Sequence, residues 1–365
     1  MARPHAAALV EDAMNRKVTG FLQGRRGWTC RAIGYIGYGG ESFVRVMGRV
    51  VLSRQHDDEE TTASEDPSAI EERLNASATL RERAEEQVRG WRAFMTAQAM
   101  DHRVVIVVNG RSHEVRTDRS GYVDTVITDH GLSPGWHEVT IAPDQGRPAI
   151  ARVLIIDAAV RFGIVSDIDD TVMITSLPRP FIAAWNTFVR HEQARHIVPG
   201  MAPMYRELLA GQEGAPIFYL STGAWNTCGT LTRFLKRHGY PFGPLLLTDW
   251  GPTNTGWFRS GQDHKRTNLH RLAREFPYIS WVLIGDDGQH DPRIYGDFAI
   301  DRPDVVRAIG IRELTPAEQV LSHGIPVSNE GFLPKVHRPV AVVRAPDGYG
   351  LLPKLKAVLG GHEVL

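Results

Sequence analysis

Cysteine is scarce in this chain of 365 residues, which contains only Cys30 and Cys228. The two lie far apart and neither belongs to a Cys-x-x-Cys pattern, so we expect neither a disulfide framework nor a cysteine-ligated zinc site. No histidine signature accompanies Cys228, which we interpret as a small buried residue and not as a nucleophile.

Long apolar runs and an excess of charge are also missing. No stretch approaches the roughly 20 apolar residues of a membrane span, and the first residues lack the apolar core of a signal peptide. The 42 basic and 42 acidic residues balance, whereas a nucleic-acid binder is usually basic. We therefore expect a cytoplasmic protein without a nucleic-acid partner.

The chain is long enough for two domains, and its texture changes near residue 158. Before that point, alternating strands and an Asn109-Gly110 hairpin signal predict an antiparallel β-sandwich with a structural or positioning role. An apolar stripe from 68 to 97 predicts a helical insertion into it. The predicted segments are an N-terminal helix at 1–27, the sandwich at 28–157, an α/β domain at 158–314 and a C-terminal tail at 315–365.

The α/β domain is predicted from short apolar runs that alternate with helical stretches. Such runs are typical of a Rossmann-like parallel sheet that is covered on both faces. The predicted strands are 164–165, 217–220, 245–247, 281–284, 298–300 and 306–311.

Polar side chains follow several of these strands, at the edge where parallel α/β sheets collect their chemistry. They are Asp167, Asp169, Asp170 and Thr171 after the first strand, Ser221 after the second, Lys265 at a helix start, and Asp286, Asp287 and Asp291 after the strand at 281. Each also has a plainer interpretation, as a polar turn, a helix cap or a surface lysine. Their shared placement favours a site.

Together these side chains supply what phosphoryl transfer needs. A carboxylate can act as the nucleophile, and a second one can protonate the leaving oxygen and then activate water. A magnesium ion would neutralise clustered carboxylates and phosphoryl oxygens. A hydroxyl and a lysine, here Ser221 and Lys265, can bind the remaining oxygens.

Three stretches carry a resemblance to a known family. Ser166-Asp-Ile-Asp-Asp-Thr171, Tyr219-Leu-Ser221 and Leu283-Ile-Gly-Asp-Asp-Gly-Gln-His-Asp291 resemble the catalytic domain of the actin-patch-associated phosphatidate phosphatases, within the haloacid dehalogenase superfamily. The similarity spans roughly residues 160 to 312. It implies a haloacid dehalogenase-like fold with a small cap and a magnesium-dependent phosphatase.

The resemblance also implies residue roles. Asp167 would be the nucleophile and Asp169 the acid/base, with Mg²⁺ held by the Asp167 carboxylate, the Asp169 backbone carbonyl and Asp286. Asp287 stands where family members often carry Ser, so it could either bind the metal or support Asp286. Asp291 would orient Lys265 or a metal-bound water.

Residues 172–198 leave room only for a flap and a small helix, and a small cap leaves a site open to bulky substrates. Phe181 and Trp185 could meet a lipid interface, with Arg179 and Arg190 attracting anionic headgroups. Alternatively, this apolar face packs on the catalytic domain.

Three functions therefore stay open at this point. The first is a phosphomonoesterase acting on phosphatidate or a related lipid phosphate, with peripheral membrane contact. The second is a phosphatase of a soluble sugar, nucleotide or protein phosphate. The third is a non-catalytic membrane or protein adaptor, for which paired carboxylates at a strand end have no use.

Overall fold

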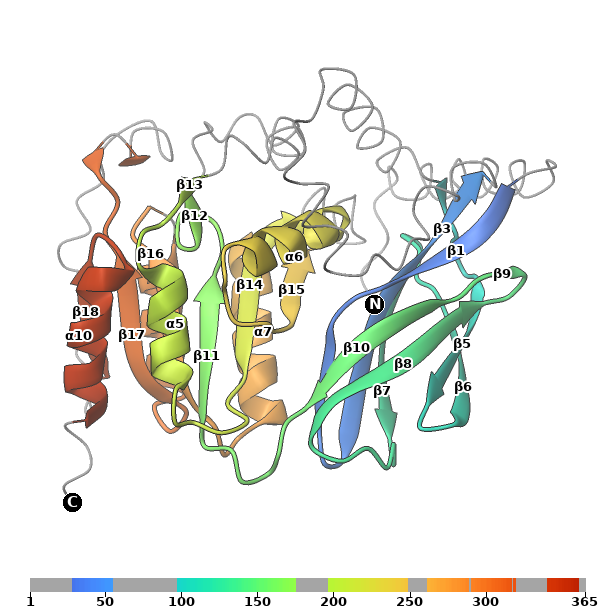
Figure 1. Cartoon of the computed structure of the whole chain (residues 1–365), viewed down its shortest axis with the longest axis horizontal. Helices are drawn as coiled ribbons and strands as arrows, with labels where there is room; N and C mark the ends of the chain where they lie inside the picture. Colours follow the sequence, from blue (N-terminus) through green and yellow to red (C-terminus); the bar gives the residue numbers. More distant parts are fainter. Residues whose placement is uncertain are drawn as a thin grey trace.

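The computed structural model describes residues 28–54, 97–174, 196–248, 261–288, 290–316, 318–319 and 340–360. The predicted N-terminal helix at 1–27, most of the predicted insertion at 68–97 and most of the predicted cap lie outside these residues. Figure 1 shows two β-sheets side by side, the sheet from the first half of the chain on the right and the sheet from the second half on the left.

The first sheet has ten strands and is mainly antiparallel. Its strands are β1 (Trp28–Gly34), β2 (Gly37–Gly40), β3 (Phe43–Arg54), β4 (Ala97–Gln98), β5 (Arg103–Val108), β6 (Arg111–Arg116), β7 (Tyr122–Thr128), β8 (Gly135–Pro143), β9 (Gly146–Arg147) and β10 (Ala149–Ile155). The β5–β6 hairpin turns at Asn109 and Gly110, as its sequence signal predicts.

The sandwich prediction needs a correction, because these strands form one hydrogen-bonded sheet and not two. The sheet folds back on itself, so that β1 approaches β10 face to face. A Cβ atom at Gly34 would lie 2.6 Å from the Ile150 carbonyl oxygen, and only glycine permits that approach. Apolar side chains that alternate along the strands fill the fold, among them Val46, Ile106 and Ile141.

The second sheet has six strands, all parallel, in the order β15-β14-β11-β16-β17-β18. They are β11 (Phe162–Asp167), β14 (Ile217–Ala224), β15 (Leu245–Thr248), β16 (Ser280–Asp286), β17 (Val306–Arg312) and β18 (Ala341–Ala345). The predicted α/β class with a parallel sheet is confirmed. All but one residue of each central strand is buried, as expected for a sheet covered on both faces.

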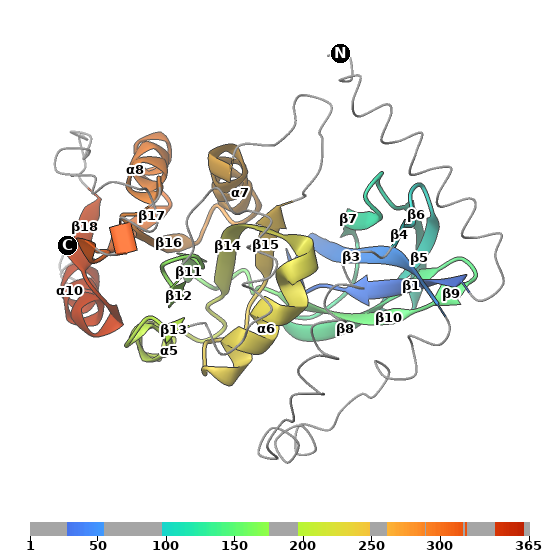
Figure 2. The ribbon, with the colours of Figure 1, turned by 90° about the horizontal axis from the view of Figure 1, so that it is seen from above.

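Helices cover both faces of this sheet (Figure 2). They are α5 (Met201–Leu209), the 3₁₀ turn η4 (Trp225–Thr227), α6 (Cys228–Arg237), α7 (Gly261–Glu275), α8 (Asp291–Asp301) and α10 (Gly348–Gly360). Seen from above, α7 and α8 lie on one face, and α5, α6 and α10 lie on the other.

Two parts of the second half differ from what the sequence suggests. Residues 298–300, predicted as a strand, form the end of α8. Pro292 lies in the first turn of that helix, and Ile294, Tyr295, Phe298 and Ala299 bury one helical face. In addition, β18 and α10 come from the predicted C-terminal tail, yet β18 pairs with β17 at the edge of the sheet.

The first sheet has its own apolar core, and a few of its residues, Tyr38 and Met47 among them, pack into the core of the second sheet. Tyr38 of β2 is fully buried, and its ring lies 5.0 Å from that of Phe218 on β14, edge to face. The Tyr38 hydroxyl donates to Glu275 Oε2 at 2.8 Å, and Arg45 Nη2 lies 3.0 Å from Glu275 Oε1. Because Glu275 is the last residue of α7, the first sheet holds the end of a helix that belongs to the second.

This packed junction predicts a single cooperative unfolding transition for the described part of the chain. Tyr38→Ala removes a buried ring from the junction and should cost about 3–5 kcal/mol of unfolding free energy. Tyr349→Ala, at a side chain that is 67% exposed, is the matched control and should cost less than about 0.5 kcal/mol.

Calorimetry of both variants measures the effect. Two separate transitions, with only the first shifted by Tyr38→Ala, would show that the sheets are energetically independent.

Candidate active site

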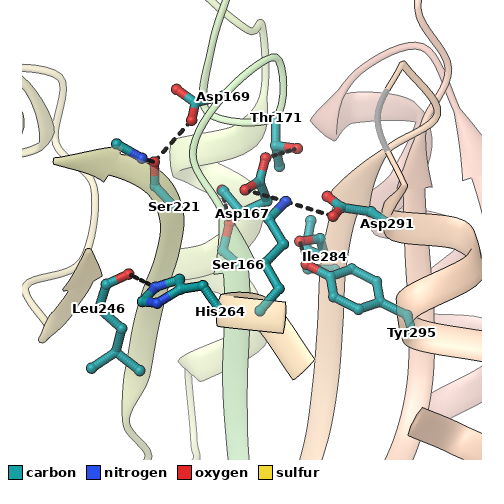
Figure 3. Close-up of polar contacts among 12 residues, drawn as sticks. Ser166, Asp167, Asp169, Thr171, Ser221, Leu246, His264, Ile284, Asp291 and Tyr295 are labelled. Atoms are coloured by element: carbon teal, nitrogen blue, oxygen red, sulfur yellow. Dashed lines mark hydrogen bonds and ion pairs between the residues drawn. The ribbon is translucent and has the colours of Figure 1, made fainter. Parts of the chain in front are cut away.

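The acid-bearing segment begins where β11 ends. Asp167 is the last residue of that central strand, between β14 and β16, and it is fully buried. The chain then reverses: Asp170 adopts a φ of 56°, and its N–H donates to the Met173 carbonyl at 2.8 Å. Aspartate tolerates this left-handed conformation better than most residues. The reversal keeps Asp167, Asp169 and Thr171 at one edge of the sheet (Figure 3).

Backbone and hydroxyl contacts hold this segment in place. Ser166 Oγ donates to the Asp167 carbonyl at 2.7 Å and lies 2.6 Å from the Tyr205 hydroxyl on α5. The Tyr240 hydroxyl donates to the Val172 carbonyl at 2.9 Å. These contacts fix the backbone on both sides of the acidic residues.

Lys265 is the cation of the site. Its side chain is only 2% exposed, and Nζ lies 2.7 Å from Asp167 Oδ1 and 2.5 Å from Asp291 Oδ1, where it donates a hydrogen bond. Burial alone would lower the pKa of Lys265. The negative charges of Asp167, Asp291 and Asp286 together raise it by more, so the pKa lies above its ordinary value. Lys265 is therefore charged and bridges two acidic loops.

Asp169 has a different partner from Asp167. Ser221 Oγ, in the second half of β14, donates to Asp169 Oδ2 at 2.8 Å, while the Gly223 N–H donates to Ser221 Oγ at 2.9 Å. Burial raises the pKa of Asp169 to about 6, although the hydrogen bond from Ser221 lowers it. Asp167 and Asp169 thus have different polar partners, Lys265 for the first and Ser221 for the second (Figure 3).

Three carboxylates converge beside Lys265. Asp167, Asp286 and Asp291 each offer an oxygen, and these oxygens lie within 4.8 Å of one another. All three residues are fully buried. Gly285 makes room for the group, because a Cβ there would lie 2.5 Å from Asp291 Oδ2.

The cluster has more negative charge than its protein partners balance. Within the part of the chain that the structure describes, neither oxygen of Asp286 has a hydrogen-bond partner, and Asp291 Oδ2 has none either. Burial raises the pKa of Asp286 well above its ordinary value, and the nearby Asp291 and Asp167 raise it further. Buried oxygens without donors are costly, and oxygen-only ligands suit a hard divalent cation.

Asp287 lies apart from this cluster. Its Oδ1 accepts a hydrogen bond of 2.8 Å from the Leu314 N–H, and its own N–H donates to the Arg312 carbonyl at 2.9 Å. Of the two roles that the sequence left open for Asp287, these contacts favour support of the loop that carries Asp286.

Sequence reasoning missed two features of the site. It treated Asp291 as an orienting residue; Asp291 does contact Lys265, but it also joins the carboxylate cluster. It also gave no role to Arg312, which donates from Nη1 to the Asp170 carbonyl at 2.7 Å. A charged residue directly after an apolar strand was the only available signal for Arg312.

The cap begins as a short ribbon in which β12 (Met173–Ile174) pairs antiparallel with β13 (His196–Ile197). The residues predicted to meet lipid, between 179 and 190, lie outside the described ranges. No helix in those ranges is long and apolar enough to cross a membrane.

The fold and the site together define an α/β protein with a parallel sheet. Buried carboxylates and a lysine lie at the carboxyl ends of its strands. Residues 162–313 match the family model described as "Phosphatidate phosphatase APP1, catalytic domain". The second half of this chain is thus similar to that catalytic domain, which confirms the resemblance drawn from the sequence motifs.

Individual relatives support the same relationship. Phosphatidate phosphatase APP1 of Saccharomyces cerevisiae is 26% identical over 170 residues, which cover 46% of this chain and 29% of the yeast protein. An uncharacterized protein of Schizosaccharomyces pombe is 25% identical over 152 residues, which cover 41% of this chain and 25% of that protein. The match thus spans less than a third of either relative.

Among solved structures, an uncharacterized protein from Listeria monocytogenes serotype 4b aligns with 54% of this chain and 98% of its own. Its TM-score is 0.33 and its sequence identity 15%, values too low to bear on function.

The charge imbalance predicts the stability of the metal-free protein. Because folding raises the pKa of Asp286, its carboxyl favours the folded state fully at pH values below the ordinary pKa of about 4, where it is protonated. That contribution is lost as pH rises through the raised pKa. Asp286→Asn removes the charge, so it should stabilise the metal-free protein by about 1–3 kcal/mol at pH 8 and by less at pH 5.

Asp129→Asn is the control, because Asp129 is exposed and lies outside the cluster. Thermal unfolding in chelator at both pH values measures the two variants. An Asp286→Asn protein that is less stable than wild type at pH 8 would contradict the imbalance.

Proposed function

We propose that this protein is a magnesium-dependent phosphomonoesterase of the haloacid dehalogenase type, with phosphatidate or a related lipid phosphate as its substrate. The observation that carries the proposal is the buried group of Asp167, Asp286 and Asp291 beside Lys265. The match of residues 162–313 to a phosphatidate phosphatase catalytic domain supports the reaction class and the substrate.

In the proposed reaction, Asp167 is the nucleophile. One of its carboxylate oxygens attacks the phosphorus, the bond from phosphorus to the alcohol oxygen breaks, and an aspartyl-phosphate forms. Lys265 stands 2.7 Å from Asp167, where its charge can offset the negative charge of an incoming phosphoryl group. The Thr171 hydroxyl, which donates to Asp167 Oδ2 at 3.4 Å, limits rotation of the carboxylate.

Asp169 is the proposed acid and then the base. Its pKa, raised to about 6 by burial, suits a group that gives and takes a proton near neutrality. Ser221 holds Oδ2, whereas Oδ1 has no hydrogen-bond partner among the described residues. Oδ1 can therefore carry the proton to the leaving alcohol oxygen. It can then accept a proton from the water that attacks the aspartyl-phosphate and releases phosphate.

Magnesium fits the set of carboxylate oxygens, because both oxygens of Asp286 and Oδ2 of Asp291 have no hydrogen-bond donor among the described residues. Asp167, Asp286 and Asp291 would hold the ion, with the Asp169 backbone carbonyl as a further ligand by family resemblance. When bound, the ion would neutralise the clustered carboxylates and polarise the phosphoryl oxygens. We leave Asp287 outside the ligand set because Leu314 holds its Oδ1.

The substrate class can be tested by phosphate release. Vesicles containing phosphatidate are compared with glycerol phosphate and p-nitrophenyl phosphate, each with magnesium and with excess chelator. We expect kcat/KM to be at least about tenfold higher for the vesicles, with activity lost in chelator and restored by magnesium.

Release from the soluble esters alone would replace the lipid assignment with a soluble phosphate. No release from any substrate would favour an adaptor.

The residue roles have their own test. Asp167→Asn should lower kcat by about 10³-fold or more, because the amide cannot form the intermediate. Asp169→Asn should still be phosphorylated slowly by p-nitrophenyl phosphate, since that leaving group needs little protonation. The exposed Asp129→Asn on the first sheet is the control.

Rapid-quench detection of the phosphorylated protein measures both variants. An Asp167→Asn protein within tenfold of wild type would rule out the mechanism.

A further inference from the structure

Arg312 is a buried arginine at the last position of β17, with a side chain 5% exposed. Each of its three guanidinium nitrogens has an acceptor. Nη1 donates to the Asp170 carbonyl at 2.7 Å, Nη2 to Glu318 Oε1 at 2.6 Å, and Nε to the Pro346 carbonyl at 3.1 Å. Each nitrogen of the guanidinium therefore donates to a protein group, two of them to backbone carbonyls and one to a carboxylate.

The backbone around Arg312 holds the other acidic loop. Arg312 pairs with Asp286 in the β16–β17 register, and its carbonyl accepts from the Asp287 N–H at 2.9 Å. Two residues further on, the Leu314 N–H donates to Asp287 Oδ1. One strand end therefore contacts both segments that supply the carboxylate cluster, through its side chain on one side and its backbone on the other.

The contact from Arg312 to Asp170 lies where the backbone of the acidic segment reverses direction. Asp170 has a positive φ, and it lies between Asp169 and the turn closed by its N–H and the Met173 carbonyl. A charged donor on the Asp170 carbonyl fixes the direction of that peptide group. It thereby fixes the path of the chain from Asp167 to Thr171.

We propose that Arg312 is a positioning residue that sets the separation between the Asp167–Asp169 segment and the Asp286–Asp287 segment, with Glu318 as its counter-charge. The inference rests on the proposed magnesium site for its binding readout and on the proposed reaction for its kinetic readout. Glu318 and Pro346 lie beyond the residues that match the family model. The C-terminal part of the chain therefore reaches the site through this guanidinium.

A residue that only fills space or balances charge would tolerate lysine. Lysine keeps the charge, but it cannot present three directed donors to Asp170, Glu318 and Pro346 at once. Arg312→Lys therefore separates positioning from simple charge compensation, and Glu318→Gln tests the counter-charge while keeping an acceptor for Nη2.

The primary readout is magnesium affinity, measured on the full chain from the rise in melting temperature with magnesium concentration. We expect Arg312→Lys to weaken magnesium binding by about 10- to 100-fold, as for other residues that orient metal ligands, and Glu318→Gln to weaken it less. Arg302→Lys is the matched control, because Arg302 makes a two-pronged pair with Asp304 away from the site. It should leave the affinity unchanged.

Kinetics and rescue supply the second readout. On p-nitrophenyl phosphate, Arg312→Lys should lower kcat at saturating magnesium more than it raises KM, because a positioning residue acts through the carboxylates and not through substrate binding. In Arg312→Ala, guanidinium at a concentration below that which unfolds the protein should restore part of the magnesium affinity. Urea, which has the same shape without the charge, should not restore it.

A folded Arg312→Lys protein that binds magnesium within threefold of wild type would overturn the proposal. If Arg312→Ala does not fold, Arg312→Lys and Glu318→Gln still decide the matter. If the wild-type protein hydrolyses none of the phosphate esters but the affinity falls as expected, the positioning role stands and the proposed function fails.

Discussion

Burial of like charges is the constraint on which this site depends. Asp167, Asp286 and Asp291 are withdrawn from water at the edge of a parallel sheet, with Lys265 as their close cation. Removing an ion from water costs several kcal/mol even after relaxation, so three carboxylates and one ammonium leave an imbalance. A divalent cation or protons must make up the difference. The charge imbalance therefore gives the site an affinity for a divalent cation that the same fold without these buried charges would not have.

The surrounding structure holds these charges together. Lys265 lies near the start of α7, and Glu275, the last residue of that helix, is held by Tyr38 and Arg45 of the first sheet. The first sheet thus holds the far end of the helix that carries the lysine. On the opposite side, Arg312 connects the two acidic loops to the end of the chain. The site is consequently supported from both halves of the molecule.

Much of this arrangement could be predicted from the sequence because parallel sheets obey a simple rule. Short apolar runs ended in Asp167, Ser221 and Asp286, and the carboxyl ends of parallel strands meet at one edge. The prediction was wrong for residues 298–300, because a three-residue apolar run does not distinguish a strand from the buried face of a helix. The role of Asp287 could not be predicted either. The direction of its side chain depends on a contact with Leu314, which is distant in sequence.

Long-range pairing explains the remaining gaps. β18 joins the sheet across residues 320–339, and nothing local in 341–345 indicates its partner. Arg312 gains its role from Asp170, 142 positions away, and from Pro346, 34 positions away. Likewise, the fold of the first sheet onto itself depends on β1 meeting β10. Local patterns predicted the elements, whereas tertiary contacts decided how they support the site.

The central claim is that the carboxylate cluster carries uncompensated charge that a divalent cation satisfies. Calorimetric titration with magnesium, at neutral pH in two buffers of different ionisation enthalpy, tests it directly. Raised carboxyl pKa values in the metal-free site mean that binding must release protons. The account predicts one saturable site with proton release that falls as pH rises, and no site in Asp286→Asn. Absence of magnesium binding by the wild-type protein, or equal binding by Asp286→Asn, would contradict it.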